Sequence, residues 1–314
     1  MIPIKSPQAL IDIGTNSVKM LVADISSSSI TSILDCTEQT RLGEGFYAQH
    51  LLQPEAICRT TATVARFVAH ATALKTASIR IIATSAARDA SNSNALIEAV
   101  RLKTGLETQI ISGENEAEWS FSGATSNPTF STHQLLVLDV GGGSTEFIIG
   151  TSDQIRFRHS FEIGSVRLLE HLSVPQSPDH SLLLEARTFL DNFIQFQVLP
   201  VLKSHISGIE TAVGVGGSSS ILAMIDEGLK DFDRERIEAK CFTLLSLEKL
   251  VELLWSLPLK KRQRLTGLPP QRADVILTGA VIYESILRAF PPLRLGISTR
   301  GLRFGALRHF NRLP

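Results

Sequence analysis

The chain has 314 residues, a length typical of about two domains, and its 31 basic residues balance its 31 acidic ones. Hydrophobic residues make up 43% of the chain, which is enough to bury a core and argues against a disordered protein. Zero net charge argues against a protein-wide basic field for nucleic acid, and no apolar run approaches the roughly 20 residues that span a bilayer. We therefore expect a folded protein with neither nucleic acid nor a membrane as a partner.

The first predicted element is a β-hairpin over residues 8–25. An apolar strand ends near Asp12, a turn of small residues follows at 14–17, and a second apolar strand begins at Val18. Such a turn exposes backbone N–H groups and hydroxyls that can hold phosphate oxygens, and a carboxylate at the strand end can hold a metal ion. Viewed alone, the same pattern is also that of a plain hairpin.

Helices and strands alternate after this hairpin. Apolar periodicity predicts, in chain order, a helix, a strand, a helix, a strand and a helix over residues 54–74, 79–84, 94–104, 108–111 and 112–123. A turn-rich stretch comes next, and we place a domain boundary there. The boundary divides the chain into domains of residues 1–126 and 127–314.

A second hairpin of the same design is predicted over residues 135–151. Aligning Asp12 with Asp139 also places Ser17 on Ser144. Two copies of one unit, well separated in the chain, predict two domains of similar core fold. The second turn contains three successive glycines, which are costly in a merely structural turn and favour the close approach of a ligand.

Mostly helices follow the second hairpin. They are predicted over residues 164–171, 181–201, 219–226, 246–255 and 273–288. A strand over 211–215 runs into a third glycine turn at 216–218, where a helix N-terminus would add partial positive charge for an anion. A plain strand-to-helix joint explains that turn equally well. Strands alternating with helices predict an α/β fold with sheets covered by helices.

Basic residues concentrate near the C-terminus. The segment from residue 257 to residue 314 contains eleven basic residues and only two acidic ones. The basic residues are Lys260, Lys261, Arg262, Arg264, Arg272, Arg288, Arg294, Arg300, Arg303, Arg308 and Arg312. Such a segment can line a groove for a polyanion. Solvated helix faces that balance the acidic middle of the chain are the alternative.

These segments together resemble a known family. The paired hairpin turns resemble those of the actin-like and sugar-kinase superfamily, and within it the chain is similar to the short, two-domain members of the exopolyphosphatase / guanosine pentaphosphate phosphohydrolase (Ppx/GppA) family. The resemblance spans nearly the whole chain. Its matches, by residue number, are 12–17, 41–45, 83–89, 111–117, 139–146, 164–168, 272–274 and 300–305.

The resemblance implies two actin-like, ribonuclease H-like domains with mixed sheets flanked by helices and an active site in the interdomain cleft. It implies a hydrolase that releases terminal phosphate from inorganic polyphosphate, or the 5′ γ-phosphate of guanosine pentaphosphate, with guanosine tetraphosphate as a further ligand. It implies Mg²⁺, or Mn²⁺ in its place, near Asp139 and Glu146, with Asp12 assisting through water. A homodimer is a further expectation at the level of the family.

The resemblance also places the general base at Glu116, directly before Ala117. Hydrolysis of a phosphoanhydride needs a base that orients and deprotonates water in line with the terminal phosphorus. Helical spacing puts Glu114 and Glu118 together and Glu116 on another face. Without the resemblance, a solvated acidic helix start explains this segment. One departure is Asn115, at a position that is commonly Glu in the family.

Phosphate contacts are implied for two arginines and the three glycine turns. Arg88 follows a strand and a small-residue turn, where a guanidinium can hold two phosphate oxygens. Arg41 lies in a similar loop, and a structural ion pair is the alternative for both. The turn residues expected to bind phosphate are Gly14, Thr15, Asn16, Ser17, Gly141, Gly142, Gly143, Ser144, Thr145, Gly216, Gly217 and Ser218. Further candidates are Arg167, Arg300 and Arg303.

Two other functions stay open. An ATP-dependent phosphotransferase of the sugar-kinase type shares the hairpins, but we see no sugar-pocket motif with its usual Asp base. A non-catalytic sensor of guanosine tetraphosphate or pentaphosphate would keep the glycine turns and tolerate loss of the base; Glu116 argues against it and Asn115 for it. Three scattered cysteines without metal-like spacing lead us to expect a reducing, cytoplasmic environment and no zinc.

Overall fold

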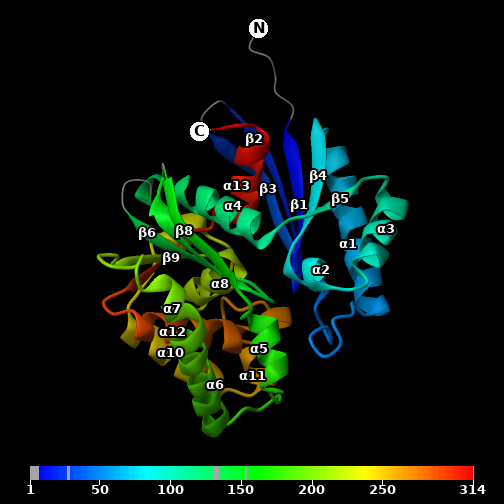
Figure 1. Ribbon diagram of the computed structural model, residues 1–314. Helices are drawn as coiled ribbons and strands as arrows, with labels where there is room; N and C mark the ends of the chain where they lie inside the picture. Colours follow the sequence, from blue (N-terminus) through cyan, green and yellow to red (C-terminus); the bar gives the residue numbers. More distant parts are fainter. Residues whose placement is uncertain (1–6, 27–28, 131–133, 153, 314) are drawn as a thin grey trace. The chain divides into compact units, whose positions relative to one another are not determined.

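Two mixed sheets organise the structure, which is a computed structural model (Figure 1). It describes residues 7–26, 29–130, 134–152 and 154–313. By its contacts the chain divides into unit 1, which comprises Met1–Gly123 with Leu302–Pro314, and unit 2, which comprises Ala124–Gly301. Each sheet is built around one of the two predicted hairpins.

Unit 1 contains a five-stranded sheet in the order β3-β2-β1-β4-β5. The strands β1 (Gln8–Ile13) and β2 (Ser17–Ile25) form the predicted hairpin, and β3 (Ile30–Gln39) extends it antiparallel. On the other side of β1, β4 (Ser78–Ala83) and β5 (Thr108–Ile110) pair parallel. Because β1 is central, its apolar residues are buried on both faces of the sheet.

Helices cover both faces of this sheet. On one face, α1 (Pro54–Ala73) and α3 (Ser93–Thr104) pack over the alternate β1 residues that include Ile11. On the other face, Leu10 shares a core with residues of α4 (Gly113–Thr125) and α13 (Leu302–Phe310). The short helix α2 (Ser85–Asp89) follows β4 directly.

The C-terminal helix α13 belongs to unit 1, although unit 2 precedes it in the sequence. Its Leu302 and Leu307 share an apolar core with Leu10 and Leu21 of the unit 1 sheet. The sequence-based division placed this segment in the second domain. That division assumed that the chain passes from the first domain to the second only once. Nothing in the local sequence pattern indicates that the chain returns to the first sheet.

Unit 2 contains a six-stranded sheet in the order β10-β11-β9-β6-β7-β8. Its strands are β6 (Leu135–Val140), β7 (Thr145–Thr151), β8 (Gln154–Phe161), β9 (Thr211–Val215), β10 (Cys241–Phe242) and β11 (Arg294–Ile297). The hairpin β6–β7 is extended antiparallel by β8, while β9 and β11 add parallel strands on the other side. This is the arrangement of unit 1, with β10 added at one edge. The predicted α/β class, with two domains of similar core built on mixed sheets flanked by helices, is confirmed.

The helices of unit 2 are α5 (Ser165–His171), α6 (His180–Phe193), α7 (Leu199–Leu202), α8 (Gly216–Asp226), α9 (Arg234–Glu238), α10 (Leu244–Ser256), α11 (Leu259–Arg262) and α12 (Ile276–Ala289). Three short segments complete it, namely η1 (Pro128–Phe130), η2 (Ile194–Val198) and η3 (Pro270–Arg272). The helix predicted over 181–201 is divided by the π-helical η2, because Pro200 lacks the N–H that a regular turn needs. In the part of the chain that the structure describes, no helix has the length and apolarity needed to cross a bilayer.

Candidate active site

The first two glycine turns close in the same way. In unit 1 the Gly14 N–H donates to the Ser17 carbonyl at 3.0 Å, and in unit 2 the Gly141 N–H donates to the Ser144 carbonyl at 2.9 Å. A Cβ atom would lie 3.2 Å from the Ser17 oxygen at Gly14 and 3.1 Å from the Ser144 oxygen at Gly141. The alignment made from sequence therefore corresponds to one turn geometry used twice.

Side chains of the first turn are held by neighbouring elements. Asn16 Nδ2 and Ser17 Oγ both donate to Gln39 Oε1 of β3, at 3.0 and 2.7 Å. Thr15 Oγ1 accepts from the Ala86 N–H at the start of α2, at 3.3 Å. These contacts fix a turn that would otherwise be mobile, as a binding site built on backbone amides requires.

Arg41 lies in a loop that is bonded to this turn. The Arg41 N–H donates to the Asn16 carbonyl at 3.0 Å, and the Gly43 N–H donates to the Thr15 carbonyl at 2.8 Å. A Cβ atom at Gly43 would lie 2.3 Å from Thr15 Cγ2, so a side chain at this position would require Thr15 to shift. Arg41 itself has a φ of 51°, in the left-handed region that disfavours residues with a Cβ. The backbone thus places Arg41 beside the first turn at some conformational cost.

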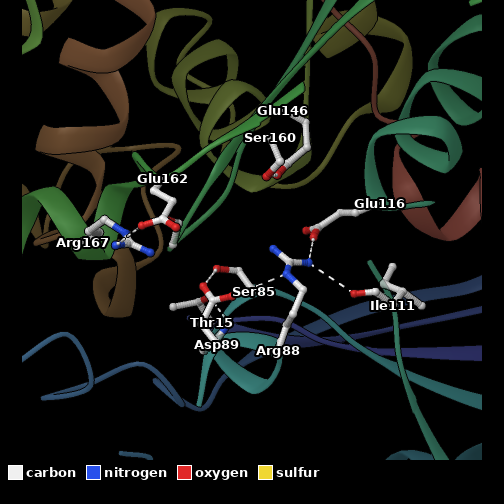
Figure 2. Close-up of polar contacts among 12 residues, drawn as sticks. Thr15, Ser85, Arg88, Asp89, Ile111, Glu116, Glu146, Ser160, Glu162 and Arg167 are labelled. Carbon is white, nitrogen blue, oxygen red and sulfur yellow. Dashed lines mark hydrogen bonds and ion pairs between the residues drawn. The ribbon is translucent and has the colours of Figure 1, made fainter. Parts of the chain in front are cut away.

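Arg88 and Glu116 form an ion pair within unit 1. Arg88 Nη1 lies 2.8 Å from Glu116 Oε2 and also donates to the Ile111 carbonyl at 3.3 Å (Figure 2). Arg88 Nε lies 3.5 Å from Asp89 Oδ1. A guanidinium at this distance favours the charged form of a carboxylate, which is the form that can accept a proton from water.

The first turn of α4 separates Glu116 from its acidic neighbours. Glu116 is only 8% exposed, while Glu114 and Asn115 are exposed, as the helical spacing predicts. The Ser112 hydroxyl accepts from the Asn115 N–H at 3.1 Å and so caps the helix. Asn115, the departure from the family pattern, therefore points to solvent in unit 1.

The triple glycine of unit 2 packs against the start of α5. The Gly141 carbonyl accepts from the Ser165 N–H at 2.9 Å, and the Gly142 carbonyl accepts from the Val166 N–H at 2.8 Å. A Cβ atom at Gly164 would lie 2.5 Å from the Gly142 carbonyl carbon. These glycines thus have a structural role in seating α5, in addition to the ligand approach expected from sequence.

Arg167 supports the same turn. Its Nε donates to the Gly143 carbonyl at 2.9 Å, and its Nη1 lies 3.2 Å from Glu162 Oε2 (Figure 2). Thr145 Oγ1 donates to the Ile163 carbonyl at 2.5 Å. Arg167 therefore holds the backbone of the turn at Gly143, and Thr145 holds its other end.

The third glycine turn brings together groups from three segments. Gly216, whose φ is 86°, lies where a Cβ atom would be 2.7 Å from Asp139 Oδ1. A Cβ atom at Gly217 would be 3.0 Å from Arg272 Nη2, and Ser218 Oγ donates to the Val140 carbonyl at 3.5 Å. The amino end of α8 therefore meets both a carboxylate and a guanidinium.

Arg272 is a candidate that sequence reasoning named only as one of the C-terminal basic residues. Its side chain is buried, at 7% exposed, and a guanidinium beside first-turn amides is a combination that binds phosphate. Next to it, Arg262 Nε donates to the Ala273 carbonyl at 2.8 Å, and burial lowers the pKa of Arg262 to about 10. The signal was present, because residues 272–274 are one of the matched segments, but the sequence did not place Arg272 beside the third glycine turn.

Asp139 and Glu146 are direct partners across β6 and β7, so both carboxylates leave the same face of the sheet. Glu146 is paired on β8 with Ser160, whose Oγ donates to Glu146 Oε1 at 2.7 Å (Figure 2). Two adjacent carboxylates suit a hard divalent cation, and Mg²⁺ commonly takes one or two carboxylates and completes its shell with water and phosphate. The donor set therefore fits the expected Mg²⁺ or Mn²⁺.

No group of three or more His, Cys, Asp or Glu side chains forms a complete metal site among the described residues. Asp12, the third predicted carboxylate, is buried at the end of β1 in unit 1. Asp139 and Glu146 both belong to unit 2. The pair alone therefore carries the geometric argument for a cation.

Several of the C-terminal basic residues have partners inside the protein. Arg300 Nη1 donates to the Ser126 carbonyl at 3.2 Å, and Arg303 forms an ion pair with Asp35. Arg288 lies 3.1 Å from the buried Glu284 carboxylate. These three arginines are engaged in structural contacts, so the expected polyanion groove does not include the C-terminal segment as a whole.

Comparison with known proteins identifies the family. The sequence matches the Ppx/GppA phosphatase family over residues 21–310. Exopolyphosphatase 2 of Mycobacterium tuberculosis is 30% identical over 290 residues, which cover 89% of this chain and 89% of that protein. The crystal structure of an exopolyphosphatase from Cytophaga hutchinsonii superposes with a TM-score of 0.87 at 25% identity, covering 98% of this chain and 99% of that one. The Aquifex aeolicus member of the Ppx/GppA family gives 0.79 at 27% identity, covering 98% and 97%. The chain therefore belongs to the Ppx/GppA phosphatase family.

Proposed function

We propose that this protein is a phosphoanhydride hydrolase that releases terminal phosphate from inorganic polyphosphate, from the 5′ end of guanosine pentaphosphate, or from both. The observation that carries the proposal is the buried Glu116 carboxylate, 2.8 Å from the Arg88 guanidinium, in a member of a phosphatase family. The relatives from M. tuberculosis and C. hutchinsonii are named exopolyphosphatases, which supports polyphosphate as the substrate class.

Glu116 is the general base of the proposed reaction. It accepts a proton as the water oxygen bonds to the terminal phosphorus, and the bridging P–O bond breaks on the opposite side. The bridging oxygen leaves on the shortened chain, and the terminal group leaves as orthophosphate. The proton held by Glu116 then passes to solvent or product, so the carboxylate is regenerated.

The three glycine turns and the arginines bind the phosphates in this proposal. The backbone amides at 14–17, 141–145 and 216–218 hold phosphate oxygens, and Arg41, Arg88 and Arg272 hold them through charged hydrogen bonds. The substrate carries high negative charge, so positioning and charge neutralisation are the main tasks of the protein.

Asp139 and Glu146 are proposed to hold Mg²⁺ or Mn²⁺, with Asp12 assisting through water. When bound, the cation neutralises charge on the transferred phosphoryl group. Ser160 orients one Glu146 oxygen and so keeps the carboxylate in place for this task.

The deciding experiment measures phosphate release from long-chain polyphosphate with Mg²⁺, with guanosine pentaphosphate assayed in parallel. Glu116→Gln should lower the rate by at least about a hundredfold. Glu114→Gln is the matched control, because Glu114 lies on the same helix turn but is exposed; its rate should stay close to that of the wild type. If neither substrate releases phosphate but guanosine tetraphosphate binds tightly, the result would favour the non-catalytic sensor. If the protein only transfers phosphate from ATP to an acceptor, the result would indicate the phosphotransferase.

A further inference from the structure

The C-terminal helix α13 contacts α4 backbone to backbone. A Cβ atom at Gly305 would lie 1.7 Å from the Trp119 carbonyl oxygen and 2.8 Å from Trp119 Cα, whereas Cβ contacts below 3.0 Å essentially do not occur. The obstacle is main chain, so no side-chain rotation can make room. Gly305 therefore sets the distance between the two helices.

This contact lies close to the proposed base. Glu116 is three residues before Trp119 on α4, which is about 4.5 Å along the helix axis. Because a helix moves as a nearly rigid element, displacing α4 at Trp119 also displaces Glu116. Arg88, by contrast, comes from a separate helix, α2. The distance between Glu116 and Arg88 consequently depends on how α4 sits on α13.

Contacts on both sides of Gly305 keep α13 from yielding. Near its first turn, Arg303 Nη1 donates to the Met20 carbonyl at 3.1 Å and forms an ion pair with Asp35. Just beyond its end, Asn311 and Gln8 exchange two side-chain hydrogen bonds, of 2.7 and 3.1 Å.

Aromatic side chains close the same interface. The Trp119 ring packs against His309 and Phe310, with centroid distances of 5.0 and 5.3 Å. In Figure 1, α13 lies beside β2, β3 and α4. The helix is thus fixed to the sheet at its two ends and to α4 at its centre.

We propose that Gly305 is a positioning residue for Glu116. It acts through α4 and does not itself touch substrate. The inference rests on the proposed role of Glu116 and adds a requirement to it: α13 must be seated without a Cβ at this position for the base to lie at its working distance from Arg88.

The test compares Gly305→Ala with Gly301→Ala in kcat, KM and the pH dependence of kcat on polyphosphate. A Cβ atom at Gly301 would meet its nearest neighbour at 3.5 Å, an ordinary contact, so this variant is a control from the same segment. Gly305→Ala should lower kcat about tenfold or more with KM nearly unchanged. Displacing a catalytic group by about 1 Å can lower the rate of the chemical step by about a hundredfold, while substrate binding does not depend on that group. Gly301→Ala should leave both constants close to wild type.

A structural defect alone would not move the pH profile. Arg88 is a charged neighbour of Glu116, and Arg88 in turn contacts the Asp89 carboxylate. If Glu116 is displaced from Arg88, the carboxylate loses its cationic partner, and the acidic limb of the kcat profile moves to higher pH. A Gly305→Ala protein that is less stable but keeps the wild-type kcat and acidic limb overturns the inference.

A spectroscopic reading reports on α4 without any assay. The sequence contains two tryptophans, so Trp255→Phe leaves Trp119 as the single reporter. Adding Gly305→Ala should change Trp119 emission, because its packing on His309 changes; unchanged emission argues against the inference. If Gly305→Ala does not fold, Arg303→Gln loosens the same helix and should move kcat and the acidic limb in the same direction, by a smaller amount.

The failure of this inference can be told apart from failure of the proposed function. If Glu116→Gln keeps full activity, the proposed base is wrong, whatever Gly305→Ala does. If Glu116→Gln is inactive and Gly305→Ala behaves as wild type, the base stands and only the positioning role is wrong.

Discussion

Glu116 and Arg88 lie on separate helices of unit 1, and their side chains meet at 2.8 Å. Both were expected to act on substrate, one as base and the other as a phosphate ligand. The structure shows them bonded to each other, which gives Arg88 two tasks. It donates a hydrogen bond to the Glu116 carboxylate and so positions it, and in the proposed reaction it offers donors to phosphate from the same planar group.

Arg88→Gln tests this double task. Removing a preorganised donor should lower kcat by on the order of a hundredfold, and the acidic limb of the pH profile should move to higher pH because Glu116 loses its cationic partner. Arg101→Gln is the control, since Arg101 makes a comparable 2.7 Å pair with Glu98 on an exposed helix face. A fall in kcat without any change in the acidic limb would mean that Arg88 acts on phosphate alone.

Arg41→Gly separates stability from activity. Arg41 has a left-handed φ of 51°, a conformation that costs a residue with a Cβ roughly 1 kcal/mol. Glycine relieves this cost, so the free energy of unfolding should stay equal or rise slightly, while phosphate release falls. Lys75→Gly is the matched control, because Lys75 has a φ of 54° in an exposed position. Its stability should respond in the same way with no loss of activity. An Arg41→Gly protein with full activity would remove Arg41 from the site.

Local patterns allowed the hairpins and several helices to be predicted closely. The strand predicted over 211–215 is β9, and the helix predicted over 54–74 is α1 with one residue fewer. In these segments the secondary structure is determined by apolar periodicity and turn residues that lie close together in the chain, so it can be predicted from the sequence alone. The repeat of the hairpin could likewise be predicted from the sequences of its two turns alone.

Elements defined by distant partners were missed. The strand β3 is an outer strand with a largely exposed, polar sequence, so its pairing with β2 leaves no apolar run to detect. The return of α13 to unit 1 and the contact of Gly305 with Trp119 join residues far apart in the chain. The Arg88–Glu116 pair is of the same kind: each residue was a candidate, but tertiary structure decided that they bond to each other.

Tyr283 provides a test of the core behind Asp139. Burial, and next the Asp139 charge, raise the pKa of Tyr283 well above its usual value near 10. Its hydroxyl lies 3.3 Å from the Val215 carbonyl and 3.4 Å from the Leu138 carbonyl. The chain contains two tyrosines, so Tyr47→Phe leaves Tyr283 as the single tyrosine. Alkaline titration of the folded Tyr47→Phe protein should therefore show no phenolate absorbance near pH 10, where an ordinary tyrosine titrates.

The same shift has a consequence for stability. Below pH 10 both folded and unfolded states keep the Tyr283 proton; above it only the unfolded state releases the proton. The free energy of unfolding should therefore fall with rising pH, by at most about 1.4 kcal/mol per unit from this group. In Tyr283→Phe that part of the slope should disappear, whereas in Tyr47→Phe it should remain. Equal slopes in the wild type and Tyr283→Phe would contradict the assignment.

Ser160 links the sheet of unit 2 to the proposed cation. Its hydroxyl bonds Glu146 Oε1 at 2.7 Å and so restrains a carboxylate that is 1% exposed. Outer partners of this kind commonly change metal affinity by about tenfold or more. Ser160→Ala should raise the Mg²⁺ concentration needed for half-maximal activity by that factor while leaving kcat at saturating Mg²⁺ nearly unchanged. Glu146→Gln should abolish the Mg²⁺ response.

The affinity change should also appear without substrate. The rise in melting temperature with Mg²⁺ should shift to higher Mg²⁺ in Ser160→Ala, because a cation that binds only the folded state stabilises it in proportion to its occupancy. Ser256→Ala is the control, since the Ser256 hydroxyl bonds only the nearby Leu253 carbonyl at an exposed helix end. A Ser160→Ala protein with the wild-type Mg²⁺ dependence in both measurements would show that Glu146 either holds its position without Ser160 or does not bind the cation. Glu146→Gln decides between these two explanations, because only a cation ligand loses the thermal response when its charge is removed.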